Sequence, residues 1–279
     1  MVLKPVKQIR KNLKNKIPLE YIRFLPSKWE INGEVLIIKL DKRFEGYKTV
    51  IAETYSNVLN CKTVLNDVGG IAGEFREPNV EVLYGTSETE TIHIENGIRF
   101  KLDPKKVMFS SGNMSERINM SKISCENEVI IDFFAGIGYF TLPIAVYCKP
   151  KKIYACEKNP NAFNYLKENI VLNHVTEIVE PLKGDNKEVA PEDIADRIIM
   201  GYIGGTEAFI EKAIKCLRNN EGIIHFHEKY PEKTPTSGVV KKLKKKAKMF
   251  NRKINILDIR NIKSYAPGIS HFVFDCEIL

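Results

Sequence analysis

The segment from Glu128 to Phe140 constrains the fold of this 279-residue chain more than any other stretch. It begins as a continuous apolar run, turns at Gly136 and Gly138, and continues into a helical pattern. An apolar run of this length before glycines predicts a buried parallel strand, a tight turn and the start of a helix. Glycines in such a turn let the backbone approach a ligand closely, because they lack a Cβ. We therefore predict a ligand site at this turn.

Three acidic residues indicate the ligand. Asp132 ends the first strand, Glu157 ends a second apolar strand, and Asp185 follows a third. A dinucleotide fingerprint needs a third glycine or alanine, where this chain has Thr141. A carboxylate before the glycines also repels a pyrophosphate, but it suits an ammonium and a sulfonium. Glu157 is placed to accept two ribose hydroxyls, and Asp185 to bind near an adenine amino group. The pattern is that of class I S-adenosylmethionine-binding domains. Helix capping is the alternative for Asp132 or Asp185 taken singly.

The charge distribution indicates a polyanionic partner. The chain has 43 basic and 35 acidic residues, a net charge of +8. Two basic stretches, residues 1–19 and 233–257, contain no acidic residue. Such segregated stretches favour nucleic acid as a partner. The alternatives are solvated helix faces and, with less support, a membrane surface.

Several classes of protein are disfavoured by composition. No apolar run of about 20 residues is present, so we expect no membrane span, and the N-terminus lacks the apolar region of a signal peptide. The six cysteines are scattered without a C-x-x-C pair, which favours reduced, buried thiols and argues against a metal site. We expect a cytoplasmic protein, without metal, that is a monomer.

Alternating elements predict two domains. Residues 1–103 read as a small α+β domain, with an amphipathic helix over 45–60 and an Asn96-Gly97 hairpin turn. Residues 104–279 read as a doubly wound α/β domain, a Rossmann-like sheet. Its later helices are expected at 139–148, 160–173 and 206–218, and its later strands at 152–157, 196–201 and 222–227. A break at Pro267-Gly268 predicts a closing antiparallel hairpin.

Several motifs together resemble a known family. They are Phe109-Ser110, Glu116-Arg117, the turn at 132–138, Cys156 to Pro160, Gly184-Asp185-Asn186 and Lys263 to Pro267. This set is similar to the archaeal and eukaryotic enzymes that modify the guanosine 3′ of the tRNA anticodon, over about residues 30–279. One branch methylates the guanine. The other, the wybutosine-synthesising branch, transfers the 3-amino-3-carboxypropyl group of S-adenosylmethionine to a carbon of the demethylwyosine base in tRNA(Phe).

The loop after the fourth strand favours the second branch. The methylating branch keeps Asn-Pro-Pro-like residues there, whereas this chain has Gly201-Tyr202-Ile203-Gly204. We also expect no extra N-terminal domain of the kind common in the methylating branch, because the amphipathic and hairpin unit starts almost at once. The resemblance therefore implies an archaeal tRNA aminocarboxypropyltransferase that releases 5′-methylthioadenosine. A tRNA guanine-N1 methyltransferase and a non-catalytic S-adenosylmethionine-binding RNA module remain as alternatives.

The resemblance and the motifs together give the expected site residues. Ser110 and Arg117 are expected to hold the aminocarboxypropyl end, with a salt bridge as the alternative for Arg117, and Tyr202 to stack on the base. These three are the expected catalytic residues. The cofactor-binding set comprises Ser110, Arg117, Asp132, Phe134, Ala135, Gly136, Gly138, Glu157, Lys158, Asn159, Asp185 and Asn186. His225 and His227 lie in one predicted strand and are expected to face opposite ways, in core or edge roles. No general base is assigned.

Overall fold

A computed structural model describes residues 4–233 and 236–279. The chain divides into two compact units, residues 1–94 with 99–111 and residues 95–98 with 112–279. The β5–β6 hairpin, β5 (Thr91–Glu95) and β6 (Ile98–Leu102), contributes to both units. Its turn is the expected Asn96-Gly97, with φ of 49° and 77°, as a two-residue hairpin turn requires. The domain boundary between residues 103 and 104 stays a prediction, since the units change over at Ser111.

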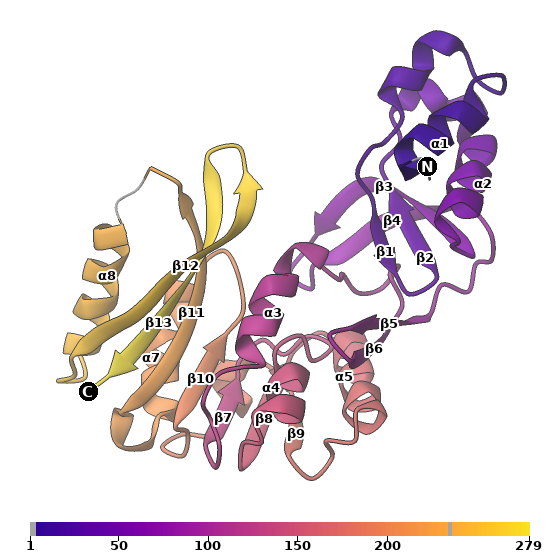
Figure 1. Ribbon diagram of the computed structural model, residues 1–279. Coiled ribbons are helices and arrows are strands. Elements are labelled where there is room, and N and C mark those ends of the chain that lie inside the picture. The colour runs from indigo at the N-terminus through magenta and orange to yellow at the C-terminus, as the bar shows by residue number, and fades with distance from the viewer. Residues whose placement is uncertain (1–3, 234–235) are drawn as a thin grey trace. The chain divides into compact units, whose positions relative to one another are not determined.

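The first unit is a four-stranded sheet with helices beside it (Figure 1). The strand order is β1-β2-β3-β4, in which only the β2–β3 pair is parallel. Helix α2 packs on β3 and β4, and α1 packs on α2, around a core that includes Leu36, Tyr55 and Val64. The elements are α1 (Pro5–Leu13), η1 (Leu19–Phe24), β1 (Glu30–Asn32), β2 (Val35–Ile38), η2 (Lys42–Tyr47), α2 (Lys48–Leu59), β3 (Thr63–Ala72) and β4 (Glu77–Tyr84).

The second unit contains a seven-stranded sheet of order β12-β13-β11-β10-β7-β8-β9. Strands β11, β10, β7, β8 and β9 run parallel, and β13 is antiparallel to both β11 and β12. The elements are η3 (Ser111–Asn113), which begins in the first unit, α3 (Met114–Met120), β7 (Val129–Asp132), α4 (Thr141–Tyr147), β8 (Lys152–Glu157), α5 (Pro160–Leu172), β9 (Val179–Lys183), α6 (Asn186–Val189), β10 (Arg197–Met200), η4 (Thr206–Phe209), α7 (Ile210–Cys216), η5 (Arg218–Asn220), β11 (Gly222–Pro231), α8 (Thr236–Lys248), β12 (Ile254–Ala266) and β13 (Ile269–Ile278). The expected doubly wound, Rossmann-like sheet with a closing antiparallel hairpin is confirmed.

This strand order positions the site. The chain runs from β7 outward through β8 to β9, then returns to place β10 on the other side of β7. Ligands bind in open α/β sheets at such a switch point, beyond the carboxyl ends of the strands. The loops after β7 and β10 therefore border the expected crevice.

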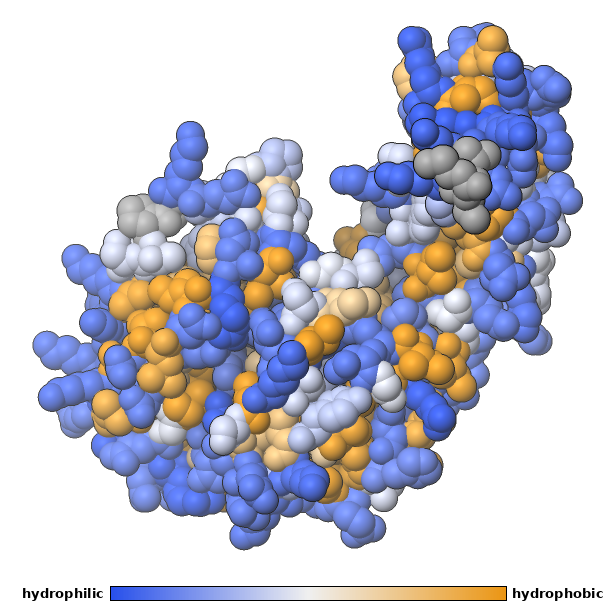
Figure 2. Space-filling view, in the orientation of Figure 1, coloured by the Kyte–Doolittle hydropathy of each residue, from blue (hydrophilic) through white to orange (hydrophobic). Residues whose placement is uncertain are grey.

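The core and the surface follow the sequence pattern. Helices α7 and α8 contribute to a core with Ile131, Ile198 and Phe274 of the sheet. All six cysteines lie among the described residues, where they are buried and free. Figure 2 shows a mostly hydrophilic face with scattered apolar patches. No helix in the described ranges is long and apolar enough to cross a membrane.

Candidate active site

Asp132 fixes both ends of the glycine-containing turn. Its Oδ1 accepts a hydrogen bond from the Phe134 N–H at 3.1 Å, and its Oδ2 accepts one from the Thr141 hydroxyl at 2.7 Å. The side chain is fully buried, and this burial raises the pKa of Asp132 to about 6. Asp132 thus bonds to both ends of the turn, whereas the N-cap position of α4, the alternative expected from the sequence, is occupied by Phe140. Its charge still influences any cation that binds nearby.

The two glycines of the turn have no room for a side chain. Gly136 has φ of +58°, and a Cβ placed on it would lie 2.3 Å from Cε2 of Tyr139. Gly138 has φ of +102°, and a Cβ there would lie 2.6 Å from Cγ of Leu142. The Ala135 N–H donates to the carbonyl of Cys156 at 3.0 Å, which ties the turn to β8. The sequence reading of a tight turn after a buried strand is confirmed.

Glu157 joins this turn to the next one. Its Oε2 accepts from the Gly136 N–H at 2.7 Å, and its Oε1 accepts from the Asn159 N–H at 2.6 Å. Burial raises the pKa of Glu157 above its ordinary value. Asn159 in turn caps α5, because its Oδ1 accepts from the Asn161 N–H at 2.9 Å. A carboxylate has about four acceptor positions, so Glu157 keeps positions for ribose hydroxyls.

Asp185 and Asn186 follow β9 beside the same turns. Burial alone would raise the pKa of Asp185, but the Lys187 N–H and the Lys158 ammonium together lower it. Lys158 Nζ lies 3.3 Å from Asp185 Oδ2. Asn186 donates through Nδ2 to the carbonyl of Phe133 at 3.1 Å.

The amide oxygen of Asn186 indicates a ligand with a hydrogen-bond donor. It is buried and has no hydrogen-bond partner within the described residues. Buried polar atoms of this kind are rare, because leaving one unpaired costs about 1–3 kcal/mol. An adenine amino group would satisfy it. With the glycine turn and the carboxylate of Glu157, the residues present fit S-adenosylmethionine.

An aromatic group lies at the switch point. Phe134, after β7, stacks on Tyr202, after β10, with ring centroids 5.1 Å apart and an interplanar angle of 26°. Phe209 meets Phe134 edge to face at 5.0 Å. Tyr202 is half-buried, so part of its ring is open to a partner. The stacking role of Tyr202 on an RNA base stays a prediction.

The two residues expected at the aminocarboxypropyl end lie in different units. Ser110 belongs to the first unit, and its role stays a prediction. Arg117, on α3, is buried and forms a bidentate ion pair with Glu95, with distances of 2.5 Å from Nε to Oε1 and 2.6 Å from Nη2 to Oε2. The geometry therefore matches the salt-bridge alternative. Its role toward a methionine carboxylate also stays a prediction.

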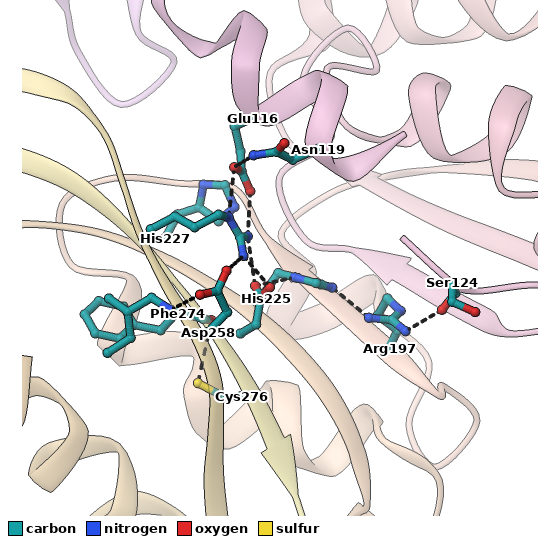
Figure 3. A network of polar contacts seen from close by, with 12 residues as sticks. Glu116, Asn119, Ser124, Arg197, His225, His227, Asp258, Phe274 and Cys276 are labelled. Atoms are coloured by element: carbon teal, nitrogen blue, oxygen red, sulfur yellow. Dashed lines mark hydrogen bonds and ion pairs between the residues drawn. The ribbon is translucent and has the colours of Figure 1, made fainter. Parts of the chain in front are cut away.

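A network of polar contacts connects α3, β10, β11 and the β12–β13 hairpin (Figure 3). Arg260 of β12 contacts Glu116 of α3 at 2.9 Å and Asp275 of β13 at 2.5 Å. Asp275 accepts from His225 at 2.7 Å, and His225 also contacts Arg197. Burial alone would raise the pKa of Asp275, but His225 and Arg260 lower it well below its ordinary value. The network joins α3 to the antiparallel hairpin.

The expectation for the two histidines of β11 is wrong in one respect. Residues two apart in a strand share a face, and both rings contact β13, His225 at Asp275 and His227 at His271. Burial, then His271, lowers the pKa of His227 well below its ordinary value. His227 therefore stays neutral inside the core, as the expected core role requires.

Sequence reasoning missed Glu228, which organises the loop after β10. Its Oε1 accepts from the N–H groups of Gly204 at 2.8 Å and Lys229 at 2.9 Å, and its Oε2 from those of Gly205 and Thr206, each at 2.9 Å. The signal was a single carboxylate in β11, which also carries His225 and His227. Glu116 was missed as a partner of Arg260 because the two lie far apart along the chain, and Asp275 because its pairing depends on the register of the β12–β13 hairpin.

Comparisons with known proteins agree with this geometry. A family model described as the TRM5/TYW2 methyltransferase domain matches residues 91–257, and one described as the TYW2 N-terminal domain matches residues 9–89. The chain is 44% identical over 271 residues to the tRNA(Phe) (4-demethylwyosine(37)-C(7)) aminocarboxypropyltransferase of Pyrococcus horikoshii, covering 97% of this chain and 96% of the relative. It is 38% identical over 263 residues to the tRNA (guanine(37)-N(1))-methyltransferase Trm5b of Pyrococcus abyssi, covering 94% and 78%.

Solved structures are similar over most of the chain. P. horikoshii TYW2 in complex with MeSAdo has a TM-score of 0.87 at 40% identity, covering 98% of this chain and 99% of that one. Methanocaldococcus jannaschii TYW2 in complex with AdoMet has a TM-score of 0.74 at 41% identity, covering 90% and 99%. A complex of aTrm5 with tRNALeu has a TM-score of 0.85 at 30% identity, covering 100% and 80%.

Proposed function

The chain belongs to the TRM5/TYW2 methyltransferase family, and we propose that it transfers the 3-amino-3-carboxypropyl group of S-adenosylmethionine to tRNA(Phe). The acceptor is a carbon of the demethylwyosine base 3′ of the anticodon. The observation that carries the proposal is the 44% identity, over 97% of the chain, to a relative named for this reaction. The site supports it, because the turns that carry Gly136, Glu157 and Asn186 fit the donor.

The reaction needs positioning more than covalent help. The ring carbon attacks the γ-carbon of the methionine chain, and the bond from this carbon to sulfur breaks. Its electrons stay on sulfur, so neutral 5′-methylthioadenosine leaves, and the ring carbon gives its proton to a base or to water. All three carbons on the sulfonium can be attacked, so the carbon that faces the base decides the product.

The residues of this chain have assigned tasks in the proposal. Glu157 binds the ribose, Asn186 and Asp185 bind the adenine, and the turn from Asp132 to Gly138 contacts the nucleoside. Ser110 and Arg117 hold the methionine end, and Tyr202 stacks on the base. Lysines 241, 242, 244 and 245 of α8 bind the tRNA backbone. A monomer acting on cytoplasmic tRNA is part of the same proposal.

Mass spectrometry of tRNA(Phe) carrying demethylwyosine, after incubation with S-adenosylmethionine, tests the function. We expect an aminocarboxypropyl addition together with 5′-methylthioadenosine. A methyl addition with S-adenosylhomocysteine would replace the proposal by the methyltransferase reading, which the 38% identity to Trm5b favours. If the protein modifies neither tRNA that carries demethylwyosine nor tRNA that carries guanosine at this position, the non-catalytic module is favoured. Glu157→Gln is the control for dependence on the site.

A further inference from the structure

The loop after β10 has little conformational preference of its own. It contains Gly201, Gly204 and Gly205 and no proline before Thr206. Glycines lose more conformational freedom on ordering than other residues, so a loop of this composition is costly to fix. Gly204 and Gly205 also adopt φ of +105° and +96°. An external group must therefore select this one conformation.

The carboxylate of Glu228 supplies that selection. It is only 5% exposed, and its two oxygens accept four backbone N–H groups, three of them from the consecutive residues Gly204, Gly205 and Thr206. Successive N–H groups converge on one anion when the backbone passes through left-handed conformations, which the two glycines provide. Hydrogen bonds to an ionised, buried acceptor are about twice as strong as neutral ones. The hydrogen bonds to Glu228 thus hold the loop in the observed conformation.

The same loop carries the aromatic surface of the site. The Thr206 hydroxyl donates to the carbonyl of Tyr202 at 2.8 Å, so the clamped end of the loop holds the tyrosine backbone. The Tyr202 ring then stacks on Phe134, which follows Asp132 in the glycine-containing turn. Glu228 is therefore linked to the switch point through Thr206 and Tyr202.

We propose that Glu228 is a positioning residue for the group transfer: by clamping Gly204, Gly205 and Thr206 it fixes Tyr202, and Tyr202 sets which carbon of the donor faces the RNA base. This inference rests on the proposed function. It goes beyond it by assigning control of the loop, and hence of the transferred group, to the buried carboxylate of Glu228.

Two substitutions separate positioning from folding. Glu228→Ala removes both acceptor oxygens and leaves a cavity of carboxylate shape. Glu228→Gln keeps the volume but keeps only one acceptor oxygen, and it turns an NH₂ group toward two backbone N–H donors. Exposed Glu232→Gln, whose side chain accepts from Ser270, is the matched control on the same strand end. Formate is added as a small carboxylate able to enter the cavity of Glu228→Ala.

We expect both Glu228 variants to bind S-adenosylmethionine and tRNA as the parent does, by calorimetry and filter binding. Their kcat should fall on the order of a hundredfold, because a misplacement of about 1 Å has that effect. The product ratio should shift toward methyl transfer. Formate should restore part of the kcat of Glu228→Ala and none of that of Glu228→Gln, and Glu232→Gln should match the parent.

Two outcomes would overturn the inference. One is an unchanged kcat and product ratio in either Glu228 variant. The other is a parallel loss of donor affinity, melting temperature and activity without any rescue by formate, which would make Glu228 a purely structural residue. The parent protein is assayed before any variant. If the parent transfers no aminocarboxypropyl group, the proposed function is refuted instead of the inference about Glu228.

Discussion

At the residue scale, the acids of the site differ in what already occupies their oxygens. Asp132 is fully buried and bound to Phe134 and Thr141, whereas Glu157 has two of its acceptor positions filled by backbone N–H groups. We therefore expect Asp132 to influence the donor through its charge, and Glu157 through direct hydrogen bonds. The sequence indicated both residues, because acids at strand ends are informative, but it did not separate these roles.

The raised pKa of Asp132 makes donor binding depend on pH. An ordinary aspartate titrates near pH ~3.9, whereas burial raises the pKa of Asp132 to about 6. A raised acid pKa favours the folded protein below about pH 4, and this contribution is lost as pH rises through about 6. Cationic S-adenosylmethionine favours the ionised form, so its affinity should rise between pH ~5 and ~7 and then level off.

Calorimetry across this range measures the effect. Neutral 5′-methylthioadenosine is the control ligand and should bind with little dependence on pH. Asp132→Asn should flatten the S-adenosylmethionine profile. A flat profile for the parent protein would mean that the Asp132 charge does not reach the bound sulfonium or ammonium.

The Arg117–Glu95 pair requires a test that separates stability from binding. Both side chains are buried, so Arg117→Met alone removes the charged partner that Arg117 provides to Glu95 and should cost about 3–5 kcal/mol of unfolding free energy. The double variant Arg117→Met with Glu95→Gln should recover most of that loss, as measured by urea denaturation. The transfer activity of this stable double variant is then compared with that of the parent protein. Full activity there would contradict the assignment of Arg117 to the methionine carboxylate.

At the scale of elements, periodicity predicted most of the second unit. The expected strand at 152–157 is β8, and the expected helix at 160–173 is α5, which ends at Leu172. Such elements are set by local pattern, as are the caps at Asn159 and Asp185. The clamp at Glu228 and the network through Arg260 depend on partners that only the fold brings together, so local patterns could not reveal them.

Helix α8 carries most of the lysines of the basic stretch at residues 233–257, and one face of the helix is buried. Val239, Leu243 and Ala247 are buried at four-residue spacing, whereas Lys241, Lys244 and Lys245 are exposed. Exposed Lys242 pairs with Glu207 at 3.1 Å. Neutralising lysines 241, 242, 244 and 245 with glutamine should weaken tRNA binding and reduce the salt slope by roughly 0.7–0.9 for each phosphate that the protein no longer neutralises.

The control for α8 is the affinity for S-adenosylmethionine, which should not change. A second control, Lys152→Gln, removes a lysine that is ion-paired to Glu180 on the sheet. Binding measured between about 50 and 200 mM salt gives the slope. A slope equal to that of the parent would identify this run as a solvated helix face.

At the scale of the whole molecule, each unit has its own core and its own large sheet, while the β5–β6 hairpin contributes to both. The residues between Asp132 and Asn186 that we propose to bind the donor all belong to the second unit. At about 100 times its Kd, S-adenosylmethionine should stabilise the unit that binds it by about 2.7 kcal/mol. Hydrogen exchange should therefore show added protection in β7, β8 and β9 and little in β1 to β4.

The same hydrogen-exchange experiment also tests the role of Ser110. It lies in the first unit, so protection of the segment around Ser110 by S-adenosylmethionine, without protection of β1 to β4, would support its expected contact with the methionine end. 5′-Methylthioadenosine, which lacks that end, is the matched control. Equal exchange around Ser110 with both ligands would remove Ser110 from the site.

The position of β13, between β11 and β12 in the sheet but after both in the sequence, affects how the chain folds during synthesis. This strand pairs with β11 on one side and β12 on the other, yet it follows both in sequence. During synthesis, β11 therefore has an open edge until the ribosome has added the residues after Pro267-Gly268. An open edge can pair with a neighbouring nascent chain. A chain that ends between Lys263 and Gly268 should thus keep this open edge and aggregate, even though it contains every loop that we propose to bind the donor.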